Sequence, residues 1–283
     1  MISGDRQQEG AAGMDMEGRA EKAEEAGDLE AALGLWRELA IRDRDAVFFC
    51  HFGRVAQELE RWEEAENAFA QALRLDAGLY LAMESMGDLW ATRTDKSDAE
   101  SFGKAKEWFL AALKHERSAR VLTFLGNINV ALDDPNAARH AFQEAIQLDP
   151  DFEEALYNLA VLDEKMNPER SMELLDRAIQ IDPDYLMAHQ ALGRLLQKAK
   201  DLARAEYHFR RCLEIDPTDY WSLLYLANAL AVQGKSKEAE QSYLLATTLY
   251  PERKEGAQFF ARFLESIGKT QEAAVIRHRE SSP

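Results

Sequence analysis

The chain has 283 residues, of which 46% are hydrophobic and 30% charged, so it carries enough apolar side chain for a full core. Its net charge of −17 comes from acids spread along the whole length. That charge argues against binding to nucleic acid, which needs clustered Lys and Arg, and against anionic membranes. No apolar run is long enough to cross a bilayer, so we expect no membrane insertion.

The N-terminal segment is polar and rich in small residues. Residues 1–12 show no helical pattern and are expected to be disordered, and no apolar run suggests a leader. Cys50 and Cys212 are far apart in sequence, which is no disulfide framework and fits a reducing compartment. The expected location is therefore the cytoplasm.

Helical segments then follow in a repeating order. A Leu-Gly-like pair is followed, after a gap, by an Ala-x3-aromatic pair. The gap from Gly or Ala to Ala is twelve residues in four repeats: 53 to 65, 126 to 138, 193 to 205 and 227 to 239. Prolines at positions 150, 183, 217 and 251 are 33 or 34 residues apart and should end the second helices of their repeats. A fixed period of this size is typical of stacked helical repeats.

Counted in chain order, the pattern predicts eight repeats, which start near residues 13, 46, 80, 119, 153, 186, 220 and 254. The first has a polar first helix, as an end cap should. The third contains six extra residues within Thr92–Gly103, which we expect to form a polar loop between its two helices. This insert is either a tolerated surface loop or a partner contact. The last repeat has Arg277 where an aromatic is expected and is interpreted as the second cap.

These motifs resemble the tetratricopeptide repeat family over residues 13–283, nearly the whole chain. The resemblance implies an all-α, right-handed α-solenoid (superhelix) of about eight helix-turn-helix units. It also implies that the first helices line a concave face and that the second helices form the convex face.

The second, fifth, sixth and ninth positions of each repeat should share the concave face of the first helix. From the fourth repeat onward these positions are rich in amides, arginines and aromatics. Amides can hold an extended backbone, arginines can meet an acidic group, and aromatic or Met side chains supply apolar contact. The alternative is that part of the set only packs against neighbouring helices. The predicted peptide-binding groove consists of Phe124, Asn127, Tyr157, Asn158, Met187, Gln190, Arg194, Trp221, Leu224, Tyr225, Asn228, Gln258 and Arg262.

Catalytic motifs do not emerge from the sequence. No two histidines have metal-ligand spacing, and neither a phosphate-binding loop nor a nucleophile elbow occurs. We therefore expect no catalytic residues, no metal, no cofactor and no enzyme activity.

The predicted function is a scaffold or adaptor that binds a peptide segment of a partner protein. The alternative is a regulatory or targeting subunit of an enzyme or assembly complex. Apolar residues near the C-terminus, from Phe259 to Ile267, also suggest a homo-oligomer formed through an end repeat.

Overall fold

The computed structural model describes residues 16–280, with side chains to residue 277, and within this range the secondary structure is helical. The expected disorder of residues 1–12 and the start near residue 13 lie outside the described part. After a helix over residues 16–25, the helices are α2 (Leu29–Asp43), α3 (Ala46–Glu58), α4 (Trp62–Leu75), α5 (Tyr80–Thr92), α6 (Asp98–His115), α7 (Ala119–Ala131), α8 (Pro135–Leu148), α9 (Glu153–Asp163), α10 (Pro168–Ile181), α11 (Leu186–Lys198), α12 (Leu202–Ile215), α13 (Tyr220–Val232), α14 (Ser236–Leu249), α15 (Lys254–Ser266) and α16 (Thr270–Glu280).

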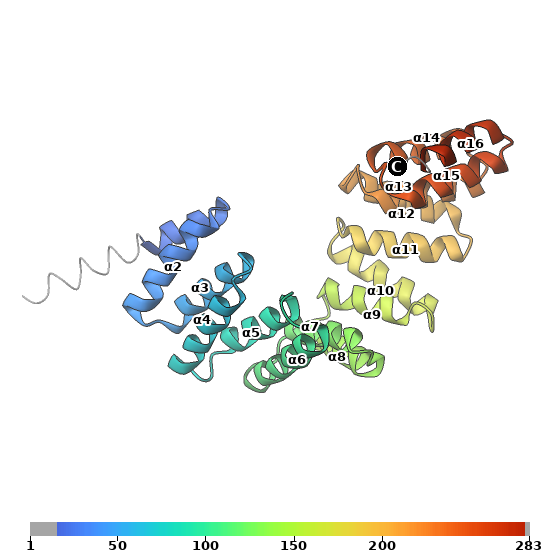
Figure 1. The fold of residues 1–283 in the computed structure, drawn as a ribbon. Coiled ribbons are helices and arrows are strands. Elements are labelled where there is room, and N and C mark those ends of the chain that lie inside the picture. Colours follow the sequence, from blue (N-terminus) through green and yellow to red (C-terminus); the bar gives the residue numbers. More distant parts are fainter. Residues whose placement is uncertain (1–15, 281–283) are drawn as a thin grey trace, which may run out of the picture. The chain divides into compact units, whose positions relative to one another are not determined.

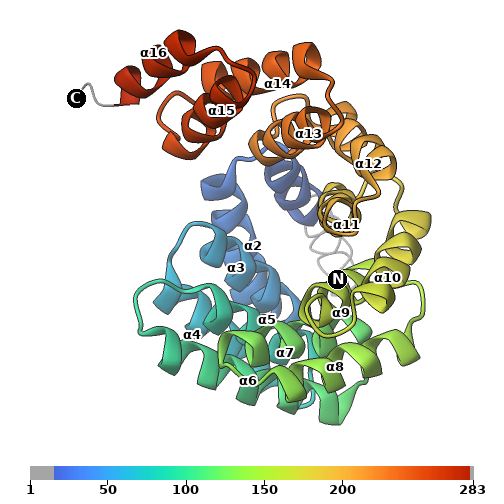
Figure 2. The same cartoon turned by 90° about the vertical axis from the view of Figure 1, so that its right-hand side faces the viewer.

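The helices form two compact bodies, an N-terminal body (Met1–Pro150) and a C-terminal body (Asp151–Pro283). Each is a stack of helical hairpins, in which the two helices of a hairpin pack on each other and on the next hairpin (Figure 1). Figure 2 shows α4, α6 and α8 along one side of the N-terminal body. We call the side formed by second helices the second-helix face, and the opposite side the first-helix face.

The first helix of each repeat begins where the sequence pattern starts a repeat, at Ala46, Tyr80, Ala119, Glu153, Leu186, Tyr220 and Lys254. Several helices are capped by an Asp or Asn side chain that accepts from a backbone N–H in the first turn. The second helices α8, α10, α12 and α14 each end two residues before one of the spaced prolines. Proline lacks the N–H that a continuing helix needs, so it ends each second helix there.

The Leu-Gly and Ala-x3-Phe pairs meet inside each hairpin. A Cβ added to Gly126 would lie 2.3 Å from the ring of Phe142, and one added to Gly193 would lie 2.6 Å from the ring of Phe209. Gly53 with Phe69 and Gly87 with Phe109 show the same close approach, at 2.4 Å. The phenylalanine rings are almost fully buried. Glycine is needed at these positions because the ring occupies the space of a methyl group.

In six repeats, the turn between the two helices of the hairpin contains a residue with a left-handed backbone conformation. Gly27, Gly234 and Gly268 have φ between 73° and 82° at this turn. In three other repeats Glu60, Asp133 and Lys200 adopt φ between 57° and 65° at the corresponding turn. Non-glycine residues seldom adopt this conformation, so the two packed helices impose it on the turn.

The C-terminal hairpin α15–α16 buries most of the apolar residues that suggested self-association. Phe260, Phe263 and Leu264 are at most 6% exposed, while Phe259 and Ile267 are each 36% exposed. The expected apolar patch at this end is therefore largely part of the core. Arg277, which replaces the aromatic, pairs instead with Glu265 on α15 at 2.9 Å.

Candidate functional site

Exposed apolar side chains mark the first-helix face of the C-terminal body. Met187 on α11, Trp221 on α13 and Phe259 on α15 are 51%, 41% and 36% exposed. They lie on three successive first helices, of which α13 contacts both α11 and α15. Large apolar side chains are usually buried, so their recurrence on one face singles out a candidate interaction surface.

Aromatic contacts connect this surface to the core of the C-terminal body. The Trp221 ring stacks on Tyr225 with centroids 6.0 Å apart, and Tyr225 packs on the buried Phe209 at 5.5 Å. Tyr157 on α9 contacts Tyr185 at 5.4 Å, and burial raises the pKa of both phenols. These rings are held by neighbours and lose little side-chain freedom when a ligand contacts them.

Two of the predicted polar residues already have partners within the body. Gln190 donates from Nε2 to Asp219 Oδ2 at 2.6 Å and to Ser222 Oγ at 3.2 Å. Arg194 pairs with Glu164 at 3.3 Å. The Gln190 bonds fix the amide so that its oxygen remains as an acceptor. The pairs thus orient the side chains, and Arg194 must share its charge with Glu164 when it meets an acidic ligand.

Asn158, Asn228, Gln258 and Arg262 complete the predicted set on this body. Gln258 and Arg262 are exposed, and the two asparagines are half-buried. The Tyr243 hydroxyl donates to Asn228 Oδ1 at 3.2 Å, which holds the Asn228 amide in place.

Three residues of the predicted groove do not belong to this surface. Leu224 is only 2% exposed and belongs to the core, so its assignment to the groove was wrong. Its helix α13 is apolar nearly all round, and periodicity alone could not tell its buried side from its accessible side. Phe124 and Asn127 lie on α7 of the N-terminal body, where Phe124 packs on Phe109 at 5.6 Å. These two residues therefore form no part of the surface described above.

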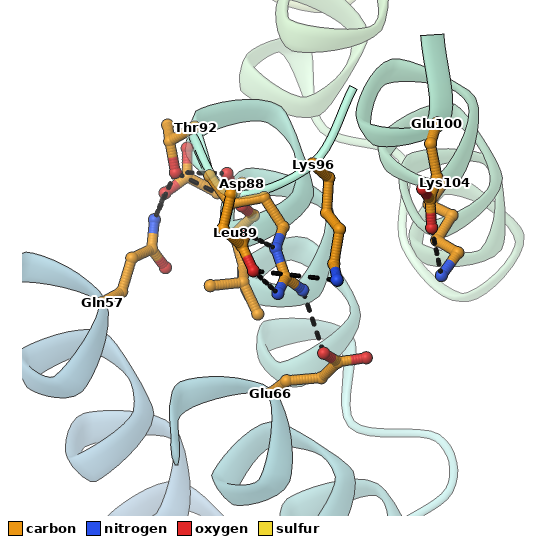
Figure 3. Close-up of polar contacts among 10 residues, drawn as sticks. Gln57, Glu66, Asp88, Leu89, Thr92, Lys96, Glu100 and Lys104 are labelled. Atoms are coloured by element: carbon orange, nitrogen blue, oxygen red, sulfur yellow. Dashed lines mark hydrogen bonds and ion pairs between the residues drawn. The ribbon is translucent and has the colours of Figure 1, made fainter. Parts of the chain in front are cut away.

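The insert in the third repeat is only partly the expected polar loop between the two helices, and contacts with neighbouring helices anchor it. Residues 93–97 link α5 to α6, and the other extra residues lengthen α6 at its N-terminus. The Arg93 side chain is 2% exposed, pairs with Asp95 at 2.7 Å and Glu66 at 3.0 Å, and lies 4.2 Å from the Trp90 ring. Figure 3 shows Glu66 pointing from α4 toward this link. A buried fork of hydrogen bonds holds the insert because guanidinium matches two carboxylates at once.

The first helices α3 and α5 are joined close to the insert. Gln57 donates to Asp88 Oδ2 at 2.8 Å and to Thr92 Oγ1 at 3.0 Å (Figure 3). On the other side, Lys104 Nζ lies 3.8 Å from the Trp90 ring centroid and 3.5 Å from Glu100. The indole is thus flanked by two cations. Periodicity could not reveal these contacts, because Arg93 lies in a polar stretch with no repeat equivalent.

Buried titratable groups in both bodies have structural roles. His189 Nδ1 lies 2.9 Å from His208 Nδ1, and His189 Nε2 lies 3.0 Å from the Pro183 carbonyl. Burial lowers the pKa of both imidazoles, that of His208 to about 4. Burial also raises the pKa of Cys50 to about 12 and of Cys212 to about 11, so both free thiols stay protonated and weakly nucleophilic.

Within residues 16–280, no cluster of three or more His, Cys, Asp or Glu side chains could hold a metal ion. Over the same range, no helix combines the length and the apolar character that crossing a membrane would require.

The fold and this surface define a helical-repeat protein of the kind that binds other proteins. Segments 125–185, 187–219 and 208–241 each match a family model described as tetratricopeptide repeat. Residues 125–185 and 187–241 are therefore tetratricopeptide repeats, as the sequence motifs indicate. Repeats of this family mediate protein–protein interactions and are generally not catalytic.

Among curated proteins, the chain is 27% identical over 239 residues to cellulose synthase operon protein C of Pseudomonas fluorescens (strain SBW25). The match covers 78% of this chain but only 18% of that relative's length. Among solved structures, pilF of Pseudomonas aeruginosa has a TM-score of 0.67 at 21% identity, covering 78% of this chain and 99% of that one. The APC/C hetero-tetramer Cut9–Hcn1 has a TM-score of 0.68 at 16% identity, covering 87% and 48%. These similarities show the fold.

Proposed function

We propose that the protein is a scaffold or adaptor without catalytic activity that binds an extended segment of a partner protein. The binding surface is the first-helix face of the C-terminal body. The observation that carries this proposal is the exposure of Met187, Trp221 and Phe259 on three successive first helices. Met and aromatic side chains supply adaptable apolar contact and are enriched among the residues that dominate interface energies.

Polar side chains around these three residues suit a peptide ligand. The Gln190 amide oxygen can accept from a backbone N–H, while the exposed Gln258 offers both a donor and an acceptor. Arg262 and Arg194 can bind a carboxylate, although Arg194 would then share its charge with Glu164. An extended chain presents unpaired backbone groups at regular spacing, which matches such a row of amides.

Site-specific photo-crosslinking in cells that naturally produce the protein would test the proposal. We expect a photoreactive phenylalanine analogue at Trp221 to capture one segment of a partner, identified by mass spectrometry of the adduct. The same analogue at Tyr207 is the control, because Tyr207 is 62% exposed but lies on α12, a second helix. Equal adducts from both positions, or none from Trp221, would contradict the proposal.

A triple variant provides a second test of the proposed binding surface. Changing Asn158, Arg194 and Asn228 together to Ala should leave the helical content unchanged and weaken the Trp221 adduct. If the folded triple variant captures the same segment with equal yield, these polar side chains do not contribute to binding.

The second candidate is a regulatory or targeting subunit of a larger complex, in which the repeats position an enzyme. The similarity to a cellulose synthase operon protein favours this candidate, although this chain spans only about a fifth of that relative. The crosslinking experiment separates the two functions: one enzyme recovered in a fixed stoichiometric ratio indicates a subunit, and several unrelated partners indicate an adaptor.

A further inference from the structure

Two pockets on the second-helix face of the N-terminal body occupy equivalent places in two different repeats. One, of about 690 Å³, lies among α2, α3 and α4 and includes Ala68. The other, of about 460 Å³, lies among α6, α7 and α8 and includes Ala141. Ala68 and Ala141 are equivalent residues, because each directly precedes the buried phenylalanine of its own repeat.

The residue at this position differs in size from repeat to repeat. Ala68 and Ala141 are the smallest residues at this position, where other repeats carry Leu35, Trp108, Leu174, His208 and Ser242. In the third repeat, Trp108 packs against two hydrophobic clusters of the N-terminal body. The chain therefore already places an indole at the equivalent position, between the two repeats that have pockets.

The pocket at Ala141 is the more apolar of the two, and it contains one unusual polar group. Leu110 and Leu113 on α6 and Leu122 and Leu125 on α7 form its apolar wall, and Lys106, His140 and Glu144 also line it. Asn129, which also lines the pocket, is 3% exposed, and its Oδ1 is buried without a hydrogen-bond partner among the described residues. Such an unpaired acceptor destabilises the folded chain unless a donor reaches it.

The pocket at Ala68 has more charged side chains in its lining than the pocket at Ala141. Charged side chains surround it and pair with one another, as Arg37 does with Glu64 at 3.6 Å. This second pocket therefore serves as an internal comparison rather than as a second proposed site.

We propose that the pocket at Ala141 binds a tryptophan side chain of a partner protein, whose indole N–H donates to Asn129. Tryptophan has a large apolar body and a single donor with no acceptor to leave unpaired. The volume of the pocket lies in the range of small-ligand sites, and Trp108 shows that the groove of the neighbouring repeat accepts an indole. This site lies on the second-helix face of the N-terminal body and is independent of the surface around Trp221.

N-acetyl-tryptophanamide, titrated into the full chain with ¹³C-labelled alanine methyls, tests this site. We expect saturable chemical-shift changes at the Ala137 and Ala141 methyls, both of which line the pocket. The analogue methylated at the indole nitrogen should bind about fivefold more weakly, as expected for the loss of one neutral hydrogen bond. Unshifted methyls at the solubility limit of the probe, or equal affinities for the two probes, would overturn the proposal.

Variants of the pocket complete the test. Ala141→Leu fills the space with the residue found at the equivalent Leu174, so the folded variant should lose probe binding. Ala68→Leu is the matched control and should bind the probe normally. Asn129→Leu should remove the preference for the unmethylated probe. Binding that survives Ala141→Leu, or a preference that survives Asn129→Leu, would place the probe elsewhere.

Discussion

At the scale of single residues, the fold depends on paired choices between two helices. All four repeats with a glycine at the Leu-Gly position carry a phenylalanine opposite it, as in Gly126 and Phe142. Repeats with alanine at that place carry another residue: Ala160 accompanies Leu175, and Ala227 accompanies Tyr243. The two positions vary together because a methyl group and a close-packed phenylalanine ring compete for the same space.

Gly126→Ala should therefore destabilise the protein by about 1–3 kcal/mol, since the added methyl must displace the Phe142 ring. Gly34→Ala is the matched control. Gly34 lies exposed in α2 with nothing within 4 Å of an added Cβ, so this substitution should stabilise the helix by up to about 1 kcal/mol. Urea unfolding measures both changes.

Adding Phe142→Leu to Gly126→Ala recreates the Ala160–Leu175 combination. The double variant should lose at least about 1 kcal/mol less than the sum of the two single losses. Strict additivity would mean that the ring and the methyl group do not compete.

The buried histidine pair makes stability depend on pH. The Pro183 carbonyl can only accept, so His189 Nε2 carries the proton and its Nδ1 accepts from His208 Nδ1. Protonating His189 at Nδ1 removes the acceptor of this bond, whereas protonating His208 at Nε2 keeps the bond but places a positive charge in a buried site. Arg204, Arg211, Asp182 and Asp184 are the nearby charges, but burial has the largest effect on both pKa values.

Because the pKa of His208 falls from 6.5 to about 4 on folding, the unfolded chain binds more protons below pH 6.5. The free energy of unfolding should decrease as the pH is lowered, and this group should contribute a loss of about 2 kcal/mol between pH 7 and pH 5. His208→Leu should flatten the loss of unfolding free energy over that interval. Parallel pH profiles for the variant and the parent protein would show that His208 is not its source.

At the scale of elements, the helices could be predicted wherever the repeat pattern is regular. The structure of the insert, which interrupts the pattern, could not. Seven first helices begin at the residues that the pattern marks, because Leu-Gly, Ala-x3-aromatic and proline positions recur together. The groove set is less certain, because one helix face contains both packed and exposed positions: Leu224 is buried while Trp221 is not. Ala68 and Ala141 were overlooked, although comparing the residue before each aromatic would have distinguished them.

Arg93→Ala should loosen the insert without unfolding the chain. The change removes the bonds to Asp95 and Glu66 and the contact with Trp90, with an expected cost of about 1–3 kcal/mol because both carboxylates can rehydrate. Trypsin cleavage at Lys96 should become faster. Asp98→Ala, at the first residue of α6, is the control and should change cleavage little. Unchanged cleavage in Arg93→Ala would show that other contacts hold the insert.

At the scale of the whole molecule, the two bodies have separate cores. The aromatic pairs, the capped turns and the hydrophobic clusters each lie within one body. In repeat proteins, stability is roughly the sum of single repeats and contacts with the next repeat. The chain can therefore be divided without breaking most of its stabilising contacts.

We expect fragments 1–150 and 151–283 each to be helical and to unfold cooperatively when expressed alone. Circular dichroism and urea unfolding of the fragments, compared with the full chain, measure this. A cut inside a repeat, after residue 201, is the control: fragment 202–283 has α12 without its partner α11 and should unfold less cooperatively than fragment 151–283. Fragments 1–150 and 151–283 without a cooperative transition would show that the two bodies depend on each other.

Each of the four glycines that face a phenylalanine lies in the same hairpin as that ring. Any genetic event that copies or deletes one whole repeat therefore moves both partners together, and the contact never has to be rebuilt across a junction. Arrays of this kind can lengthen by duplication while every copy keeps its own fit. Exchange within a hairpin, in contrast, would join an alanine to a phenylalanine that has no room for it.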